Sequence, residues 1–593
     1  MSEFKQEINR HLDGVEVISF DVFDTLFVRP FVDPEDAFDL VGERLGVANF
    51  RELRRRAQTV AFQRMAATQR SEIRLDDIYN CMVGLPSGIS CRQASNAELE
   101  LELAATLPNP ELIPLFRELA KAYLVVIVSD MYLPQEFFER LFERHGLPKV
   151  PMFVSCEHDA TKRDRGELFN RMIAELDIDP ERVLHVGDNA VSDVQRGREK
   201  GLKTLHYVNS AAIDYEVSGL LGTSIAASMV KLQEHRPSTD SLYSLGFRFG
   251  GPAAMGLLEW VRDQAIEDRI DVILFVARDG FVLDKIASSG HVSRLPPHHY
   301  FPGSRVSFAL ATIQEQNFDC WLDFLLSGAL GLSPDEVLAR VGVCVPEASV
   351  MQQLGLGDEV LLGPEEMVRM RRFLSAYRAE FIKVGQQNRR GLFNLLLQMG
   401  VRSDMRVAMV DVGWAGTTQE TMVNALRGML DIEIFGYYLA LVDSPECRRR
   451  REQMSMKGLL ESSLVGAEKM SRLYERRVGV ELMFSAPHEA IIGYALEPAG
   501  QVRVIEDAGR GADPISLRAA VNELQRGMLD FVGVYQGLTE QIGYRAHSVE
   551  LAHTVIDFSM IATSRLSAFN DLANFDAWGS SRNHRLTMVN YQG

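Results

Sequence analysis

Short apolar runs that alternate with helical stretches constrain the fold of this 593-residue chain more than any other feature. The first series consists of VEVISF (15–20), LVVIVS (124–129), PMFVS (151–155), VLHVG (183–187) and LKTLHYV (202–208). The second consists of DVILFVA (271–277), HHYFP (298–302), MRVAMVD (405–411) and IFGYYLAL (434–441). Strands separated by helices form parallel sheets with helices on their faces. The pattern therefore predicts an α/β protein with two Rossmann-like parallel-sheet domains.

Two long helical stretches interrupt these series. One covers residues 35–120, between the first two runs, and the other is an insertion at about residues 310–400. The segment HRPSTDS (235–241) has the composition of a linker, and helical patterns return from about residue 515. We expect four parts: a first domain over 1–210, a linker over 211–241, a second domain over 242–500 and a helical C-terminal region over 501–593.

Composition and charge narrow the classes of function. Apolar residues make up 46% of the chain and charged residues 24%, as in a globular protein. The net charge of −18 argues against a general nucleic-acid binder, because polyanions bind basic surfaces. The first residues contain no apolar segment of the signal-peptide type, and no run approaches the roughly 18 apolar residues that span a bilayer. The six cysteines form no CxxC pair. We expect a soluble cytoplasmic protein with no membrane span.

Polar residues follow the runs of the first series, where the strands should end. Ligands of open parallel sheets bind beyond the carboxyl ends of the strands. The residues found there are Asp21, Phe23, Asp24 and Thr25 after the first run, Ser129 and Asp130 at the second, TKRDRG (161–166) after the third, and Asp188 and Asp193 after the fourth. Carboxylates, a hydroxyl and a cation suit a phosphate with a magnesium ion, which prefers oxygen ligands. An aspartate beside that ion can attack phosphorus.

This order of motifs resembles the haloacid-dehalogenase-like (HAD-like) hydrolase superfamily, mostly phosphatases, over about residues 15–208. The resemblance implies that the helices of 35–120 form the cap of that family. It implies that Asp21 is the nucleophile and that Ser129 binds the phosphate, with Thr25 as a further substrate-binding candidate. It also implies a magnesium site that consists of Asp21, Asp188 and the backbone carbonyl of Phe23, supported by Asp193.

Two features of the first site stay open. The family usually has a lysine in the third motif, and Lys162 has that residue type. Arg163 instead stands at the usual number of residues before GELF (166–169), and we favour Lys162. Phe23 stands where phosphatases of the family usually carry an aspartic acid and dehalogenases an aromatic residue. The acidic fourth motif favours a metal-dependent phosphatase without that acid, slowed by about 10²–10⁴-fold. A carbon–halogen hydrolase and an inactive binding domain are the alternatives, and Asp24 would face away from Asp21 in an extended segment.

The second series is also followed by residues that suit a phosphate. Gly413 and Gly416 allow close backbone approach, and helix N-termini attract anions. The candidates are Arg278, Asp279 and Gly280 after the first run, Ser304 and Arg305 after the second, and Asp411, Gly413, Gly416, Thr417 and Thr418 after the third. Glu481 and His488 are candidates for acceptor-site groups or for structural roles, and we favour structural roles. Trp414 is expected to pack, and RRRR (448–451) to form a solvated loop.

The sequence VDVGWAGTT (410–418) resembles the ribose-5-phosphate loop of type I phosphoribosyltransferases, and FVARDGFVL (275–283) is similar to their pyrophosphate loop. The resemblance covers about residues 241–445. It implies that Asp411 holds the ribose hydroxyls and that the Gly/Thr turn binds the 5-phosphate. Val410 departs from the family, which commonly has a second acidic residue there.

Both halves together look like two-domain proteins of bacterial surface-polysaccharide synthesis. In these, one domain transfers 5-phosphoribosyl from phosphoribosyl pyrophosphate to a glycan acceptor, and the phosphatase then removes the 5-phosphate to leave a ribofuranose. A second hypothesis is a magnesium-dependent sugar-phosphate phosphatase whose C-terminal half only binds a sugar phosphate or glycan. A third is a non-enzymatic scaffold with two degenerate sites.

Overall fold

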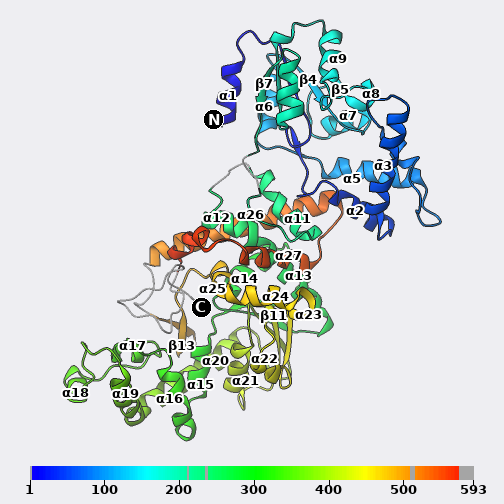
Figure 1. Ribbon diagram of the computed structural model, residues 1–593. Coiled ribbons are helices and arrows are strands. Elements are labelled where there is room, and N and C mark those ends of the chain that lie inside the picture. Colours follow the sequence, from blue (N-terminus) through cyan, green and yellow to red (C-terminus); the bar gives the residue numbers. More distant parts are fainter. Residues whose placement is uncertain (1–2, 210–212, 234–237, 508–513, 573–593) are drawn as a thin grey trace. The chain divides into compact units, whose positions relative to one another are not determined.

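The computed structural model describes residues 3–209, 213–233, 238–507 and 514–572. The chain forms two compact units (Figure 1). The first consists of Met1–Arg236 and Val534–Ala546, and the second of Pro237–Gly533 and His547–Gly593. Each unit contains one five-stranded parallel sheet, which confirms the expected α/β class. The long helix α26 (Pro514–Ile542) supplies residues to both units.

The sheet of the first unit has the strand order β5–β4–β1–β6–β7. Its strands are β1 (Val17–Phe20), β4 (Leu124–Ser129), β5 (Met152–Val154), β6 (Val183–Gly187) and β7 (Lys203–His206). Every residue of β1 is buried, because this strand lies at the centre and is covered on both faces. The chain continues from β1 to opposite sides of the sheet, with β4 on one side and β6 on the other. The carboxyl end of β1 is therefore a switch point of the topology, where ligands bind in open sheets.

Helices cover this sheet and form an insertion between β1 and β4. The covering helices are α1 (Glu3–His11), α6 (Leu112–Leu119), α7 (Gln135–Arg144), α8 (Ser155–His158), α9 (Glu167–Leu176) and α10 (Arg196–Glu199). The insertion contains α2 (Asp36–Leu45), α3 (Phe50–Ala67), α4 (Leu75–Tyr79) and α5 (Cys91–Ala105), with the strand pair β2 (Phe27–Val28) and β3 (Leu107–Pro108) at its base. A fully buried ion pair between Arg54 and Glu98, 2.6 Å long, joins α3 to α5.

Two further segments belong to the first unit. Helix α11 (Leu221–Ser228) falls within residues 211–241, the range expected as a linker, and the Ser224 hydroxyl accepts the backbone N–H of Val32 at 2.8 Å. The end of α26 contacts the insertion, where Gln541 donates to the carbonyl of Ala104 at 2.8 Å. The region that folds with the first sheet thus extends beyond residue 210.

The sheet of the second unit has the order β12–β11–β10–β8–β9. Its strands are β8 (Val272–Val276), β9 (His298–Phe301), β10 (Arg406–Asp411), β11 (Glu433–Leu441) and β12 (Ser455–Glu461). We did not predict β12, whose sequence SMKGLLE has no continuous apolar run. The adjacent helices are α12 (Leu242–Leu245), α13 (Gly251–Glu267), α14 (Gly280–Ser288), α15 (Arg305–Thr312), α20 (Arg378–Gln398), α21 (Thr417–Leu426), α22 (Pro445–Arg451), α23 (Ser462–Val465), α24 (Ala467–Glu475), α25 (Arg477–Met483), α27 (Ser548–Ala552) and α28 (Thr554–Ser559).

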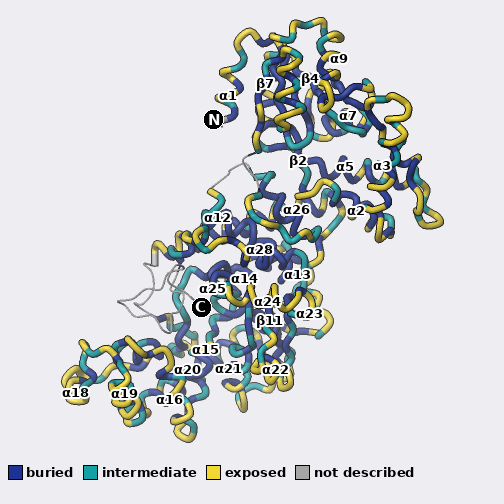
Figure 2. The backbone as a smooth tube through the Cα atoms, in the orientation of Figure 1, coloured by how far each residue is buried: buried dark blue, intermediate teal, exposed yellow. Residues whose placement is uncertain are grey.

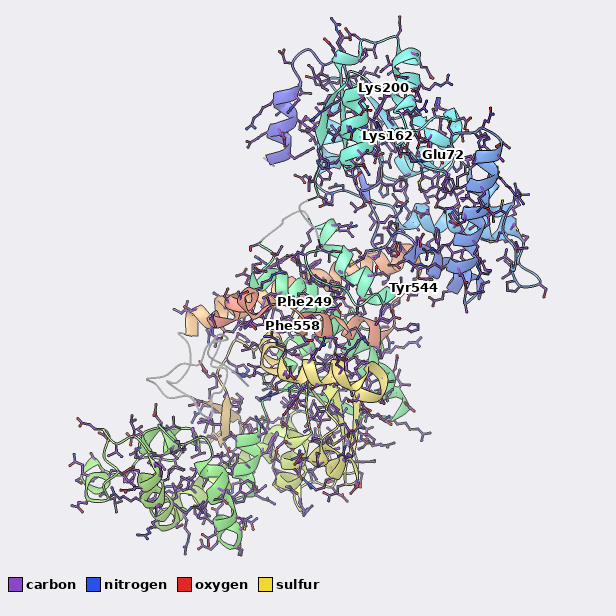
Figure 3. The ribbon with its side chains drawn as sticks, in the orientation of Figure 1. Glu72, Lys162, Lys200, Phe249, Tyr544 and Phe558 are labelled. Atoms are coloured by element: carbon purple, nitrogen blue, oxygen red, sulfur yellow. The ribbon has the colours of Figure 1, made fainter. Side chains whose placement is uncertain are left out.

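The helical insertion of the second unit has a hydrophobic core of its own. It contains α16 (Phe318–Leu326), α17 (Pro334–Ala339), α18 (Ala348–Gln353) and α19 (Pro364–Ala376). Leu322, Leu338 and Phe373 are among its buried residues. Figure 2 colours buried parts of the backbone dark blue. The C-terminal region is not wholly helical, because β14 (Val502–Glu506) pairs with β13 (Ile491–Leu496) in an antiparallel hairpin. Farther along, Phe558 packs against Phe249 with ring centroids 5.6 Å apart (Figure 3).

Candidate functional site

The end of β1 positions Asp21 at the carboxyl edge of the first sheet. The backbone N–H of Asp21 donates to the carbonyl of Val186 at 2.9 Å, so the pairing of β1 with β6 continues to this residue. Ser129 is the last residue of the neighbouring strand β4 and is buried. Asp188 follows the end of β6 directly. The sheet therefore brings three sequence-predicted residues to one edge.

Lys162 lies between two carboxylates of this edge. Its ammonium is 2.7 Å from Asp21 Oδ1 and 2.5 Å from Asp193 Oδ1, and the lysine side chain is 3% exposed. The backbone N–H groups of Lys162 and Arg163 donate to the two oxygens of Asp130, at 2.8 and 2.9 Å. Asp130 thus fixes the loop that presents the lysine.

Arg163 points to a different partner. Its guanidinium forms a bidentate pair with the buried carboxylate of Glu72, at 2.6 and 2.9 Å. Glu72 belongs to the insertion and also accepts the Ser155 hydroxyl at 3.0 Å. Figure 3 labels Glu72 and Lys162 in the first unit. Of the two candidate cations, the structure places Lys162 against Asp21 and places Arg163 against the insertion.

A buried chain of hydrogen bonds supports Asp193. His185 Nε2 lies 3.0 Å from Asp193 Oδ1, and His185 Nδ1 lies 2.8 Å from the Ser19 hydroxyl. The backbone N–H of Asn189 donates to Asp193 Oδ2 at 2.9 Å. Burial opposes ionisation of Asp193, but Lys162 and the bond from His185 hold its pKa well below the usual range. Sequence reasoning missed His185 because it is one polar residue inside an apolar strand.

The pKa values of Asp21 and Asp188, unlike that of Asp193, are raised. Burial, together with repulsion from Asp193 and Asp188, raises the pKa of Asp21 to about 8, against the attraction of Lys162. Burial and the nearby charge of Asp24 raise the pKa of Asp188 to about 6. A bound cation would favour the ionised form of both carboxyl groups and would offset the repulsion between their negative charges.

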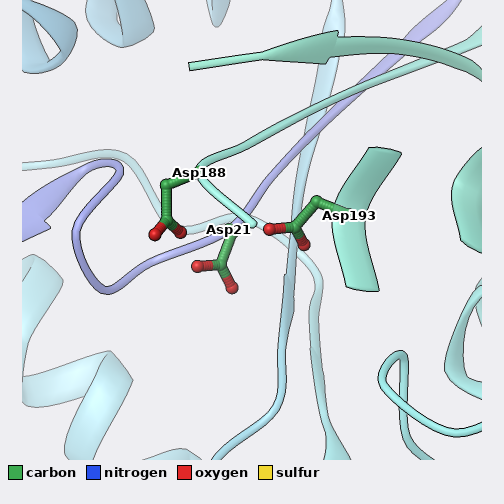
Figure 4. A group of neighbouring side chains, drawn as sticks. All are labelled: Asp21, Asp188 and Asp193. Atoms are coloured by element: carbon green, nitrogen blue, oxygen red, sulfur yellow. The ribbon is translucent and has the colours of Figure 1, made fainter. Parts of the chain in front are cut away.

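The donor set of this cluster fits magnesium. Asp21, Asp188 and Asp193 each offer a carboxylate oxygen, and these oxygens lie within 4.8 Å of one another (Figure 4). Oxygen donors of this kind are the usual ligands of magnesium. Because both oxygens of Asp193 already accept hydrogen bonds, Asp21 and Asp188 are better placed as direct ligands.

The turn after Asp21 places the remaining candidates of the first site. The Thr25 hydroxyl is buried and donates to Asp188 Oδ1 at 3.4 Å. Asp24 has a φ of 55°, and its carboxylate is 3.5 Å from the ammonium of Lys231, just after α11. The Phe23 ring lies 4.0 Å from the Arg29 guanidinium and packs against Phe137 and Phe138. Thr25 thus contacts a candidate metal ligand, whereas Asp24 pairs with a cation.

The second unit contains a cavity of about 520 Å³ at the carboxyl edge of its sheet. Most candidates of the second site line it, although they come from separate strand ends. These are Arg278, Asp279, Ser304, Arg305, Asp411, Gly413, Thr417 and Thr418. Trp414 and Glu481 line it too, as do residues that sequence reasoning missed: Arg340, Tyr474, Arg477 and Asp507. The missed residues lie on segments outside the sheet, where no strand pattern leads to them.

The glycine-rich turn after β10 is tied to the end of β11. The N–H groups of Ala440 and Val442 donate to the carbonyls of Val412 and Trp414, both at 3.0 Å. A side chain at Gly413 would place Cβ 2.9 Å from the Ala440 carbonyl oxygen, so only glycine fits there. The turn that precedes α21 is therefore held by the sheet.

Gly416 and the arginine run also support this turn. Gly416 has a φ of 78° and directly precedes α21, and the absence of a side chain there makes room for Met456. The run RRRR is not a solvated loop as we expected, but the end of α22, with each arginine in an ion pair. Arg450 binds Glu420 of α21 at 2.7 Å and the carbonyl of Ala415 at 3.0 Å.

Four carboxyl groups line the cavity, those of Asp279, Asp411, Glu481 and Asp507. Burial and the charge of Glu481 raise the pKa of Asp411 to about 7, while Arg305 and Thr418 act in the other direction. Burial and the charges of Asp411 and Glu481 raise the pKa of Asp279 well above its usual range. The cavity thus combines hydroxyls and arginines with two carboxyl groups, Asp279 and Asp411, whose pKa values are raised.

Three predicted groups, Gly280, Gly416 and His488, are not part of the cavity lining. Gly280 begins α14 and lies against the backbone of Phe275, where a Cβ would come within 2.4 Å of the carbonyl carbon. His488 binds the Tyr300 hydroxyl through Nε2 at 2.5 Å, and its Nδ1 lies 2.8 Å from the carbonyl of Glu489. The contacts of His488 agree with the structural role that we favoured.

Comparison with known proteins supports part of this picture. Residues 165–210 match the HAD-hydrolase-like family model, which supports a HAD-like hydrolase domain in the first unit. No curated protein matches the sequence. Within the part of the chain that the structure describes, no helix is both long and apolar enough to cross a bilayer.

Several solved structures are similar to about a third of the chain. The HAD phosphatase from Thermococcus onnurineus is 18% identical, with a TM-score of 0.25 over 34% of this chain and 90% of that chain. The HAD family enzyme bt-2542 from Bacteroides thetaiotaomicron is 17% identical, with a TM-score of 0.26 over 33% and 95%. The 2-haloacid dehalogenase from Pseudomonas syringae pv. Tomato DC3000 is 16% identical, with a TM-score of 0.26 over 35% and 92%. At these values the likenesses carry no functional argument.

Proposed function

We propose that the protein is a bifunctional enzyme of polysaccharide biosynthesis. The second unit transfers 5-phosphoribosyl from phosphoribosyl pyrophosphate to a glycan acceptor, and the first unit then hydrolyses the 5-phosphate. The observation that carries the proposal is that each sheet edge gathers phosphate-handling groups. Asp21, Asp188 and Lys162 meet at one edge, and the cavity at the other edge contains Arg278, Asp411, Thr417 and Thr418.

The hydrolysis step begins with attack by Asp21. A carboxylate oxygen of Asp21 forms a bond to phosphorus, the bond from phosphorus to the sugar oxygen breaks, and the sugar oxygen takes a proton from solvent, which leaves an aspartyl-phosphate. Water then releases inorganic phosphate and restores Asp21. Lys162 neutralises negative charge on Asp21 and the phosphoryl group, and the Ser129 hydroxyl binds a phosphate oxygen. Magnesium, held by Asp21, Asp188 and the carbonyl of Phe23 with support from Asp193, would reduce the negative charge of the site.

The transfer step takes place in the cavity of the second unit. The N–H groups that open α21 and the hydroxyls of Thr417 and Thr418 bind the 5-phosphate, because helix N-termini favour anions. Arg278 and Arg305 face the pyrophosphate. Asp411 binds the ribose hydroxyls and stabilises positive charge that develops on the ring as pyrophosphate leaves. Ser304 and Asp279 complete the pyrophosphate side, and Gly280 lets the start of α14 pack against the backbone of Phe275.

One observation favours a second candidate for the first unit. Phe23 places an aromatic ring where a general acid would be expected, so a carbon–halogen hydrolase is the alternative activity. The carboxylate cluster around Asp21 argues for the phosphatase, because an attack by Asp21 on carbon needs no metal site. A non-catalytic sugar-phosphate or glycan binding unit is the alternative for the second half, and a scaffold with two degenerate sites is the alternative for the whole chain.

Two assays separate these possibilities. Pyrophosphate release from phosphoribosyl pyrophosphate, with candidate glycan acceptors present, tests the second unit. Magnesium-dependent hydrolysis of p-nitrophenyl phosphate tests the first. If both activities are found, the bifunctional enzyme is supported. If only hydrolysis is found, a phosphatase with a binding unit is supported. If both activities are absent, the scaffold is supported.

A further inference from the structure

We propose that Glu481 is the general base that takes the proton from the acceptor hydroxyl during ribosyl transfer. This inference rests on the proposed transferase function of the second unit. Glu481 belongs to α25, an element outside the sheet, yet it lines the same cavity as Asp411, Thr417 and Thr418. It therefore enters the site from a different element than the strand-end residues that would bind the donor.

Trp414 fixes one oxygen of this carboxylate. The indole Nε1–H donates to Glu481 Oε1 at 2.8 Å, and Trp414 is only 7% exposed. The indole in turn lies edge-on to Tyr474, with ring centroids 5.9 Å apart. Within the described parts of the chain, no lysine, arginine or histidine forms an ion pair with Glu481. A carboxylate that is oriented but not neutralised by a cation is suited to accept a proton.

The charge of Glu481 also acts on the donor side of the cavity. Besides burial, this charge raises the pKa of Asp411, and it contributes to the raised pKa of Asp279. Glu481, Asp411 and Asp279 line the same cavity, so the base and the two carboxyl groups that would surround the ribose and the pyrophosphate share one site.

The wall beside Glu481 suits a carbohydrate. Tyr474 lines the cavity and is 41% exposed, and the Arg477 guanidinium lies over its ring at 4.7 Å. Ile492 adds an apolar contact to the same lining. An exposed aromatic ring next to an arginine and a carboxylate combines an apolar surface with groups that orient hydroxyls. The acceptor class that fits is a sugar hydroxyl.

The chemistry of the step is balanced. The acceptor oxygen forms a bond to C1 of the ribose, the bond from C1 to the pyrophosphate oxygen breaks, and pyrophosphate leaves with the electron pair. The acceptor proton moves to a carboxylate oxygen of Glu481 and later to solvent. Water can replace the glycan, which gives ribose 5-phosphate. Azide can also replace it, and because azide has no proton to lose it needs no base.

The test compares these two small nucleophiles, so it needs no identified glycan. Full-length protein is incubated with the magnesium salt of phosphoribosyl pyrophosphate, with and without sodium azide. Pyrophosphate is measured, together with ribosyl azide both with and without its 5-phosphate, because the first unit would remove that phosphate. In Glu481→Gln the amide oxygen can still accept the indole N–H. We expect this variant to lose about 10²-fold or more of the reaction with water. We expect it to keep the reaction with azide within about threefold of the unchanged protein.

A matched control is Glu475→Gln, an exposed residue of α24 that does not line the cavity, and it should behave like the unchanged protein. Wild-type hydrolysis rates in Glu481→Gln would overturn the inference. Equal loss of both reactions would also overturn it, because that result indicates a structural or donor-binding role. If the unchanged protein releases no pyrophosphate with either nucleophile, the proposed transferase function itself fails, and the inference fails with it.

Discussion

Lys162 holds its ammonium 2.7 Å from the carboxylate of Asp21, and the pair is enclosed by the protein, with the lysine side chain 3% and the aspartate side chain 12% exposed. Asp193 completes the contact on the other side of the ammonium at 2.5 Å. The adjacent residues Lys162 and Arg163 therefore have different partners, because Arg163 binds Glu72 and not Asp21. The first prediction follows from that difference.

Lys162→Met should abolish hydrolysis of p-nitrophenyl phosphate. It should also lower the free energy of unfolding by about 3–5 kcal/mol, because two buried carboxylates lose their counter-ion. Arg163→Met is the matched control and should retain hydrolysis, although it frees Glu72. Urea unfolding and the hydrolysis rate measure both effects. If Arg163→Met abolishes hydrolysis and Lys162→Met does not, the assignment of the third-motif cation is wrong.

Hydrolysis should depend on magnesium through Asp188. A chelator should stop it, and added magnesium should restore it, because the carboxylate cluster suits an oxygen-ligated cation. Asp188→Asn should raise the magnesium concentration needed for half-maximal activity or remove activity. Full hydrolysis in excess chelator would instead support the carbon–halogen hydrolase.

Phe23→Asp should increase phosphate-ester hydrolysis, by up to about 10²-fold, because it supplies a general acid two residues after Asp21. The Phe23 ring packs on Phe137 and Phe138, so the variant should also unfold at lower temperature. Phe23→Asn is the control, because asparagine has nearly the shape of aspartic acid but cannot donate or accept a proton as an acid. An equal rate in both variants would show that a carboxyl group at this position does not take part.

Asp411 should make stability depend on pH. Its pKa is raised from 3.8 to about 7 in the folded protein, so the folded state binds a proton more tightly than the unfolded state. Between these values the contribution of Asp411 to the free energy of unfolding decreases as pH rises. Asp411→Asn removes this term, so its stability relative to the unchanged protein should increase from about pH 4 to 7. Urea unfolding at several pH values measures the difference, and a constant difference would contradict it.

The sequence predicted the sheets well because buried parallel strands are continuous apolar runs. The runs LVVIVS and VLHVG coincide with β4 and β6, and Ser129 at the end of β4 and Asp188 directly after β6 lie at one edge. In contrast, β12 has no continuous apolar run, and α11 has a weak pattern within residues 211–241. Neither element shows the local signal on which the prediction depended.

The candidate sites were predictable where a residue follows a strand. Asp21 and Asp411 come from such positions, and the topology alone brings their neighbours together. His185 is a buried polar residue within a strand, and its role becomes visible only through its contact with Asp193. Glu481 and Trp414 were noted in the sequence, but their mutual hydrogen bond depends on tertiary packing. Such a contact cannot be predicted from the separation of the two residues in the sequence.

The central claim is that one chain transfers phosphoribosyl and then removes the phosphate, and product mass tests it most directly. Protein is incubated with phosphoribosyl pyrophosphate, magnesium and candidate oligosaccharide acceptors. The unchanged protein should add one pentose, Asp21→Asn should add one pentose phosphate that accumulates, and Asp411→Asn should add neither while it still hydrolyses p-nitrophenyl phosphate. An acceptor that gains pentose without phosphate in Asp21→Asn, or that gains no mass with the unchanged protein while phosphatase activity is intact, would contradict the account.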